Sequence, residues 1–156
     1  MLIYKHKERK VMEDRMKYLI ATHGKLASGF QSSLNILTGK GDEVSVIDAY
    51  LDDSDYTPKI DQFIDSVNDD EQGVIFTDLY GGSVNQKVVT KLVPKGKSNI
   101  FLISNSNLAI ILSVLLQPKG TKLTETTINK LAEESAIKPV VWNTADQDDS
   151  DDSFFD

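Results

Sequence analysis

Short apolar runs and amphipathic stretches alternate along the chain, which is the pattern of strands followed by helices. Compact apolar runs predict buried strands at residues 18–22, 44–47, 73–77 and 100–103. Apolar residues spaced three and four apart predict helices at about residues 26–38, 57–67, 84–92, 108–116 and 124–136. Thr57 and Pro58 favour a helix start with Thr57 as the N-cap and the proline at the first helical position.

This alternation predicts an α/β fold with a doubly wound, mostly parallel sheet and helices on both faces, because parallel strands are joined by right-handed crossovers. We expect the flavodoxin-like strand order 2-1-3-4, in which the first and third strands are neighbours. A last apolar run at residues 138–142 predicts a short, antiparallel C-terminal strand. Pro139 confines that strand to an edge of the sheet, because proline has no N–H for a central ladder.

The pattern predicts one folded domain over residues 16–143, flanked by two segments outside its core. Residues 1–15 show no periodicity and Met16 directly precedes the first strand, so we expect an N-terminal extension or a start at Met16. Residues 144–156 hold six aspartates and are expected to form a disordered acidic tail. Without these six residues the net charge of −7 would be −1, so the acidity belongs mainly to the tail.

The composition excludes several classes of protein. The chain has no cysteine, and its two histidines, His6 and His23, are too few for a multi-histidine metal centre, so we expect no metal and no cofactor. The apolar run 108–116 is far shorter than the ~20 residues of a membrane span, and no signal-peptide pattern follows the basic N-terminus. We therefore expect a cytoplasmic protein. No basic surface interleaved with aromatic residues is evident, so nucleic acid is not an expected partner.

Candidate chemistry gathers after the first and third strands, at the edge of the sheet where ligands bind in doubly wound folds. Thr22, His23 and Gly24 follow the first strand, and residues 78–83, Asp-Leu-Tyr-Gly-Gly-Ser, follow the third. Because these two strands are neighbours in the expected order, His23 should lie beside Asp78 and the glycine-rich turn.

These residue types suit a phosphohistidine site. A neutral imidazole is available as a nucleophile near pH 7, and a carboxylate on one ring nitrogen sets the tautomer and stabilises the imidazolium. We expect Asp78 to accept the Nδ1–H of His23, which leaves Nε2 as the attacking nitrogen. Gly81 and Gly82 are expected to present backbone N–H groups to an anion at a helix N-terminus. The predicted catalytic residues are His23 and Asp78, and the predicted phosphate pocket comprises Thr22, Gly24, Gly81, Gly82 and Ser83.

Each of these residues also has a purely structural interpretation. His23 alone would usually be a structural hydrogen-bonding group, and Asp78 a turn residue that satisfies backbone donors. Ser83 and Gln86 match the capping box S-x-x-Q, and two successive glycines match an ordinary turn. The convergence of all these residues on one point of the sheet favours function.

Two segments, Ala21-Thr22-His23-Gly24 and Thr77-Asp78-Leu79-Tyr80-Gly81-Gly82-Ser83, resemble the motifs of mannose-type enzyme IIA components of the bacterial phosphoenolpyruvate-dependent sugar phosphotransferase system (PTS). The resemblance covers about residues 16–142. It implies that His23 receives a phosphoryl group from phospho-HPr and passes it to a IIB component, and so indirectly serves the membrane IIC/IID complex. It also implies that Asp78 bonds to the active histidine and that Ser83 lines the pocket.

The resemblance further implies a homodimer in which the C-terminal strand is exchanged between subunits, which suits a short edge strand ending at Trp142. No fused IIB domain follows the tail, so a separate IIB protein is expected. Family members often read D-x-W-G-G-S-P, whereas this chain has Tyr80 and Val84 at the places of the tryptophan and the proline, which leaves the fine geometry of the loop open. Mannose, fructose, sorbose and gluconate all stay open as the sugar.

Three other functions stay open beside this one. The phosphotransfer subunit of a dihydroxyacetone kinase resembles this fold and also uses a histidine after the first strand. A serine hydrolase would use Ser83, His23 and Asp78 as a triad, but the sequence Gly-Gly-Ser-Val-Asn lacks the last glycine of G-x-S-x-G. A ligand-binding module of flavodoxin type would need a G-x-G-x-x-G fingerprint, which the chain lacks.

Overall fold

The computed structural model describes residues 16–143, and the predictions for residues 1–15 and 144–156 lie outside the described residues. The strands are β1 (Met16–His23), β2 (Val44–Ala49), β3 (Gln72–Thr77) and β4 (Ile100–Ile103). The helices are α2 (Leu26–Thr38), α3 (Thr57–Ser66), α4 (Ser83–Lys95), α5 (Leu108–Leu115) and α6 (Glu125–Glu134), with a 3₁₀ turn η1 (Gly41–Glu43). Strands and helices alternate as the hydrophobic pattern predicts. None of the helices within residues 16–143 is long and apolar enough to cross a membrane.

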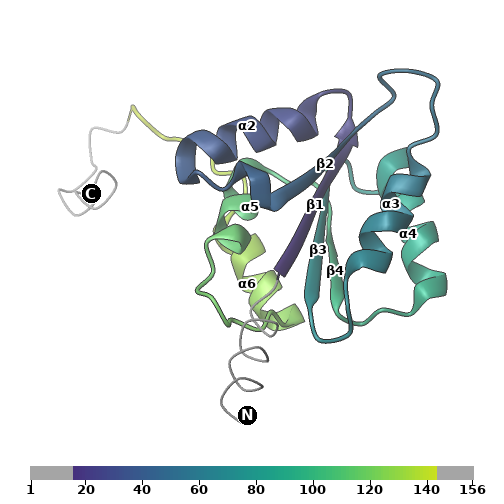
Figure 1. Cartoon of the computed structure of the whole chain (residues 1–156). Helices are drawn as coiled ribbons and strands as arrows, with labels where there is room; N and C mark the ends of the chain where they lie inside the picture. The colour runs from purple at the N-terminus through teal and green to yellow at the C-terminus, as the bar shows by residue number, and fades with distance from the viewer. Residues whose placement is uncertain (1–15, 144–156) are drawn as a thin grey trace, which may run out of the picture.

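The four strands form one parallel sheet in the order β2-β1-β3-β4, which confirms the predicted order (Figure 1). β1 is central and pairs with β2 on one side and with β3 on the other. The register places Ala21 of β1 opposite Thr77 of β3, so both strands end at the same edge of the sheet. The residues that follow these two strands therefore emerge next to each other.

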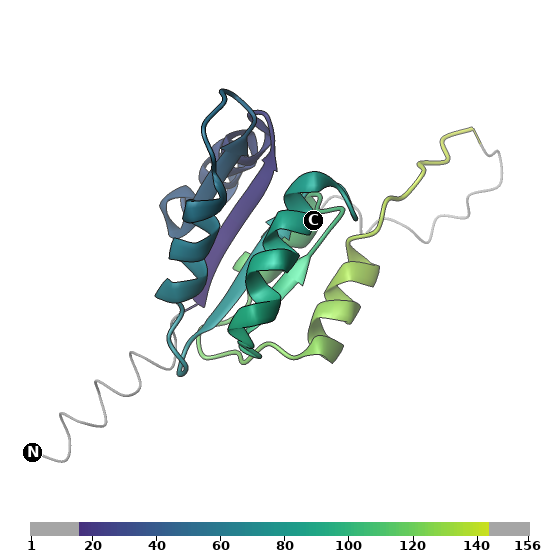
Figure 2. The same cartoon turned by 90° about the vertical axis from the view of Figure 1, so that its right-hand side faces the viewer.

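Helices cover both faces of the sheet: α2, α5 and α6 lie on one face, and α3 and α4 on the other (Figures 1 and 2). Alternate side chains of β1 point to opposite faces, so Ile20 packs with the first group of helices and Leu19 with the second. In β3, Phe76 packs with the first group of helices and Ile75 with the second. Burial on both faces explains why these central strands are apolar without interruption.

The predicted antiparallel edge strand is not present in the structure of the single chain. Residues 138–143 form no strand, and the sheet ends at β4. The apolar side chains of this segment are exposed, including Val140 at 74% and Trp142 at 85%. Apolar character alone predicted a strand here, but a strand also needs a neighbouring edge to supply its hydrogen bonds, and the fold of one chain does not bring one to this segment.

The start of α3 also differs from the prediction. Thr57 is the first residue of the helix, and Tyr56 is the N-cap. The Thr57 side chain does not cap the helix, because its hydroxyl is a donor: Asp55 Oδ1 accepts from the Thr57 N–H at 3.0 Å and from the Thr57 hydroxyl at 2.8 Å. An aspartate two residues upstream thus uses the threonine in a local turn, as Asp side chains often do.

Candidate active site

The contact between His23 and Asp78 organises the carboxyl edge of the sheet. His23 is the last residue of β1, and Asp78 comes directly after β3. Asp78 Oδ2 accepts a hydrogen bond from the backbone N–H of His23 at 2.9 Å and lies 2.8 Å from Nδ1 of the same residue. One carboxylate oxygen therefore holds both the main chain and the ring of His23. The parallel pairing of β1 with β3 brings the two residues together, as the strand order predicts.

The same contact sets which ring nitrogen is available. An ionised carboxylate only accepts hydrogen bonds, so the neutral imidazole carries its proton on Nδ1 and keeps a lone pair on Nε2. Nε2 faces the Ser83 hydroxyl at 3.1 Å. The His23 side chain is 40% exposed while that of Asp78 is only 11% exposed. The imidazole is thus partly open to solvent, while the carboxylate that orients it is largely covered.

Two opposing effects act on the pKa of Asp78. Burial raises the pKa, because it disfavours the charged carboxylate, but hydrogen bonds from the His23 N–H, the His23 ring and the Leu79 N–H outweigh it. The net result is a pKa below the ordinary value of 3.8. Leu79 N–H donates to the second carboxylate oxygen, Oδ1, at 2.9 Å. Asp78 is therefore a fixed negative charge beside His23 at neutral pH.

The two glycines of the loop do not form the predicted anion cradle. Gly81 has a positive φ of 71°, which suits glycine, but its N–H donates to Asn85 Oδ1 at 3.2 Å. The Gly82 N–H donates to the Leu79 carbonyl at 2.9 Å. Both donors are used within the loop, so the prediction that they face an anion is wrong. The N–H groups of Ser83 and Val84, in the first turn of α4, have no acceptor within the helix.

The absence of a side chain at Gly82 matters for the packing of the loop against His23. A Cβ at this position would lie 3.1 Å from both the Cβ and the carbonyl oxygen of Leu79, and 3.8 Å from Cε1 of His23. A side chain here would push the loop against its own backbone beside the imidazole. Gly82 therefore lets the loop approach the ring closely.

Ser83 is part of the site and not of a capping box. The N-cap of α4 is Gly82, with no side-chain cap, and Ser83 is the first helical residue. Gln86 Nε2 donates to the carbonyl of Gly81 at 2.6 Å, so it does not make the reciprocal bond of a capping box. The capping-box interpretation is wrong, and the Ser83 hydroxyl lies against Nε2 of His23.

Thr22 and Gly24 shape the turn behind His23 and do not face the open side of the ring. Thr22 is fully buried, and its hydroxyl accepts from the Ala27 N–H of α2 at 2.7 Å. Gly24 has a positive φ of 59°, and its N–H donates to the Ala49 carbonyl at 2.8 Å. Both residues tie β1 to its neighbours and so hold the backbone of His23 in place.

The sequence analysis missed three residues of the site: Tyr50, Tyr56 and Lys87. The Tyr50 ring stacks on the His23 ring with centroids 5.4 Å apart and 28° between the planes. The Tyr50 hydroxyl donates to Ser83 Oγ at 2.9 Å. Tyr50 follows β2, the other neighbour of β1, so the rule that singled out residues after the first and third strands applies to it as well. Lys87 is four residues after Ser83 and hence on the same face of α4.

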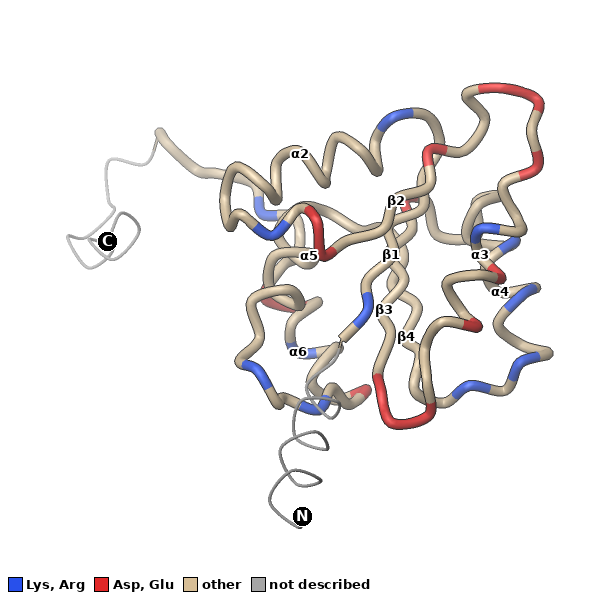
Figure 3. Tube along the Cα trace, viewed as in Figure 1, with Lys and Arg blue, Asp and Glu red and all other residues tan. Residues whose placement is uncertain are grey.

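The charges near the site are unevenly distributed. Three aspartates, Asp52, Asp53 and Asp55, gather in the loop between β2 and α3 (Figure 3). This loop begins at the same sheet edge that carries His23. A partner that approaches the histidine from this side meets a negative loop, which favours a partner surface of positive charge.

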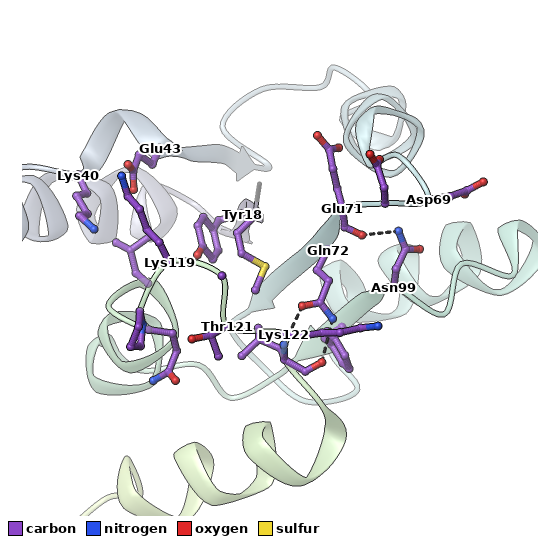
Figure 4. A pocket seen from close by; sticks show the side chains of 18 of the residues that line it. Tyr18, Lys40, Glu43, Asp69, Glu71, Gln72, Asn99, Lys119, Thr121 and Lys122 are labelled. Carbon is purple, nitrogen blue, oxygen red and sulfur yellow. Dashed lines mark hydrogen bonds between the residues drawn. The ribbon is translucent and has the colours of Figure 1, made fainter. Parts of the chain in front are cut away.

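A pocket of about 900 Å³ lies at the other end of the sheet, next to the start of β1 and β3 (Figure 4). Its walls include Met16, Tyr18, Gln72 and Asn99. None of the residues predicted for the active site lines it. His23 does not line this pocket, so the candidate active site and the pocket are separate features.

Comparison with known proteins identifies the architecture and the family pattern. The pattern of the family "PTS system fructose IIA component" matches residues 17–132. Comparison with curated protein sequences finds no significant match.

Solved structures with this fold come from several bacteria. A Klebsiella pneumoniae protein assigned to the phosphoenolpyruvate-dependent sugar PTS as a permease is 25% identical, with a TM-score of 0.68 over 81% of this chain and 92% of that one. A PTS IIA protein associated with the fucose utilization operon of Streptococcus pneumoniae is 19% identical, with a TM-score of 0.65 over 80% of this chain and 93% of that one. The mannose/sorbose-specific IIA subunit of Enterococcus faecalis is 13% identical, with a TM-score of 0.64 over 83% of this chain and 98% of that one. The last two are similar in fold.

The lowered pKa of Asp78 predicts an acid-dependent part of the stability. A carboxyl whose pKa is lower in the folded state than its unfolded value of about 3.9 stabilises the fold above that pH. This contribution is lost as the pH falls through the folded pKa. We therefore expect the free energy of unfolding to fall more steeply below about pH 4 in the natural protein than in the Asp78→Asn variant. Urea unfolding between pH 2 and pH 6 measures this difference, with the free energy of unfolding extrapolated linearly to zero urea.

The matched control is Asp70→Asn, which makes the same chemical change at an exposed position. Its pH dependence should follow that of the natural protein. Equal acid slopes for the Asp78→Asn variant and the natural protein would show that the hydrogen bonds to Asp78 do not favour its ionised form.

Proposed function

Because this chain belongs to the family of PTS fructose IIA components, we propose that it is a cytoplasmic phosphocarrier that accepts a phosphoryl group from phospho-HPr on His23 and passes it to a separate IIB component. Sugar uptake by the membrane IIC/IID complex would then depend on it indirectly. The observation that carries the proposal is the Asp78–His23 contact, which leaves Nε2 as a lone-pair nitrogen on the open side of the ring. Phosphoryl transfer needs little more than such positioning and charge stabilisation.

The transfer step balances without a proton leaving the site. The lone pair of His23 Nε2 forms a bond to the phosphorus of the donor phosphohistidine, and the donor's N–P bond breaks with its electron pair returning to the donor imidazole. The Nδ1 proton stays on His23 and donates to Asp78 Oδ2. The carboxylate compensates the positive charge that develops on the ring. Transfer to the IIB component repeats the step in the other direction.

The phosphoryl oxygens would meet donors from the first turn of α4. The N–H groups of Ser83 and Val84 lie at a helix N-terminus, where the aligned peptide dipoles favour negative charge. The Ser83 hydroxyl, now 3.1 Å from Nε2, must release this nitrogen when the N–P bond forms. It is then free to donate to a phosphoryl oxygen.

One observation favours a second candidate, a serine hydrolase. Ser83 Oγ, His23 Nε2, His23 Nδ1 and Asp78 Oδ2 are connected in the order of a catalytic triad, at 3.1 Å and 2.8 Å. The nucleophile elbow of such hydrolases reads G-x-S-x-G, however, and Asn85 stands at the place of its last glycine. Labelling of Ser83 by a fluorophosphonate probe would support the hydrolase.

The phosphotransfer subunit of a dihydroxyacetone kinase is a separate alternative. Transfer of the phosphoryl group from His23 to a dihydroxyacetone kinase subunit, instead of to a IIB protein, would support it.

The first prediction concerns the phosphorylated residue. Incubation with phosphoenolpyruvate, enzyme I and HPr should place an acid-labile, base-stable label on His23, and His23→Ala should abolish it. The fold should be unaffected, because the His23 side chain is 40% exposed and lies at the end of a strand. His6→Ala is the matched control and should be labelled normally. Label on Ser83, or no label on the natural protein, would contradict the proposal.

The second prediction concerns the role of Asp78. Asp78→Asn keeps the shape of the side chain, but the amide can present N–H to the ring and removes the charge that stabilises imidazolium. A similar change in a serine protease costs ~10⁴-fold, and we expect a smaller loss, on the order of 10²–10³-fold, in the single-turnover rate of phosphoryl transfer. Asp70→Asn should transfer at the normal rate. If Asp78→Asn transfers the phosphoryl group at the normal rate, Asp78 is only a structural turn residue.

The C-terminal segment supports a dimer by strand exchange as part of this proposal. Within residues 16–143, β4 pairs only with β3, so its outer edge has no neighbouring strand. Three side chains of β4 are only half-buried. The segment after α6 exposes four large apolar side chains: Ile137, Val140, Val141 and Trp142. A bare edge and an extended apolar segment in the same chain complement each other if two copies exchange their C-terminal residues.

The third prediction follows from this exchange. A chain that ends before Lys138 should lose the dimer or aggregate, because the β4 edge stays uncovered. A chain cut after Thr144 keeps the apolar segment and should remain a dimer. Light scattering coupled to gel filtration measures both masses. A soluble, monomeric 1–137 chain with full phosphoryl transfer would refute the exchange.

A further inference from the structure

A chain of hydroxyl groups leads from the buried Tyr56, the N-cap of α3, to Nε2 of His23. The Tyr56 hydroxyl donates to the Tyr50 hydroxyl at 3.2 Å, and the Tyr50 hydroxyl donates to Ser83 Oγ at 2.9 Å. Ser83 Oγ lies 3.1 Å from His23 Nε2. Because Nδ1 carries the ring proton toward Asp78, Nε2 can only accept, so Ser83 must be the donor of this last bond. All the bonds therefore run in one direction, from Tyr56 to His23.

This direction constrains the single proton of Ser83. A serine hydroxyl has one O–H to donate and lone pairs to accept with. Since Tyr50 occupies an accepting position of Ser83 Oγ, the Ser83 proton is left to point toward Nε2. The same proton would point to a phosphoryl oxygen once the lone pair of Nε2 is used in a bond to phosphorus. Tyr50 thus keeps Ser83 a donor toward the transfer position in both states.

Tyr50 is itself held from several sides. Its ring stacks on the His23 imidazole and meets the Tyr56 ring edge-on at 5.4 Å. Lys87 Nζ lies 5.3 Å from the centre of the Tyr50 ring and 4.5 Å from that of Tyr56, within the range of cation–π attraction. The backbone of Tyr50 has a positive φ of 67°, a conformation that is uncommon for residues other than glycine. A residue in such a conformation at a reactive group indicates that the surrounding contacts hold it there.

We propose that Tyr50 is a positioning residue for phosphoryl transfer at His23: its ring holds the plane of the imidazole, and its hydroxyl keeps the Ser83 O–H aimed at the place that the phosphoryl group occupies. This inference rests on the proposed function. No proton leaves Tyr50 or Ser83 in the step; only the hydrogen bond of Ser83 changes its acceptor, from Nε2 to a phosphoryl oxygen. Tyr50 acts through Ser83, and this dependence makes the proposal testable.

The experiment is a double-mutant cycle of Tyr50→Phe and Ser83→Ala, read as the single-turnover rate of His23 phosphorylation by phospho-HPr. Phenylalanine keeps the stacked ring and removes only the hydroxyl. We expect Tyr50→Phe to slow the transfer about tenfold, which corresponds to the loss of one hydrogen bond of ordinary strength. Ser83→Ala should slow it at least as much, and the double variant should be no slower than Ser83→Ala alone. The final extent of His23 labelling should stay unchanged in Tyr50→Phe.

Tyr18→Phe is the matched control, because it removes a hydroxyl in the pocket at the opposite end of the sheet. It should transfer at the normal rate. Nitrogen NMR of the His23 ring adds a readout in the unphosphorylated protein: in Tyr50→Phe, the Nε2 resonance should move as its hydrogen bond from Ser83 weakens, while Nδ1 stays protonated.

The outcomes separate the two proposals. If the natural protein takes no phosphoryl group on His23, the proposed function fails. If the natural protein is labelled but Tyr50→Phe matches its rate and its Nε2 resonance, the role of Tyr50 fails alone. Multiplicative effects in the double variant would also overturn it, since Tyr50 would then act independently of Ser83.

Discussion

One hydrogen-bonded pair, Asp78 with His23, determines what the carboxyl edge of this sheet can do. Asp78 Oδ2 binds both the backbone N–H and Nδ1 of His23, so the carboxylate fixes the position and the tautomer of the ring together. The pair exists because β1 and β3 are parallel neighbours that end at the same edge. A shift of this register would separate the two residues, and the histidine would then be an ordinary exposed side chain.

The structure around this pair keeps the ring rigid while leaving one nitrogen open. Thr22 and Gly24 use their hydrogen bonds on α2 and β2, behind the histidine. The buried Asn85 of α4 accepts from the Gly81 N–H in the loop after β3, and its amide also donates to Thr77 and Ser104. Such a fully bonded support costs little reorganisation when a charged group arrives, which is the condition for stabilisation by fixed dipoles. Nucleophile, support and acidic loop are thus parts of one surface.

The edges of the sheet carry a different constraint. β2 and β4 are the outer strands, and three of the four side chains of β4 are half-buried. The segment after α6 exposes large apolar side chains, among them Ile137 and Trp142. In the proposed dimer, a second copy would cover this segment and the outer edge of β4.

Hydrophobic periodicity by itself predicted the elements, since it depends on local spacing. The flavodoxin-like order expected for a doubly wound sheet predicted that His23 meets Asp78, and the structure has this order. Only the tertiary structure decided which hydrogen-bond donors are used. The N–H groups of Gly81 and Gly82 donate within the loop, and the N–H of Thr57 donates to Asp55 at the start of α3. Tyr50 reaches the ring of His23 from the end of β2. It also decided that residues 138–143 find no strand partner within one chain. The physical reason is that a hydrogen bond depends on distances and directions between groups far apart in sequence, and these are set only after packing has fixed the backbone.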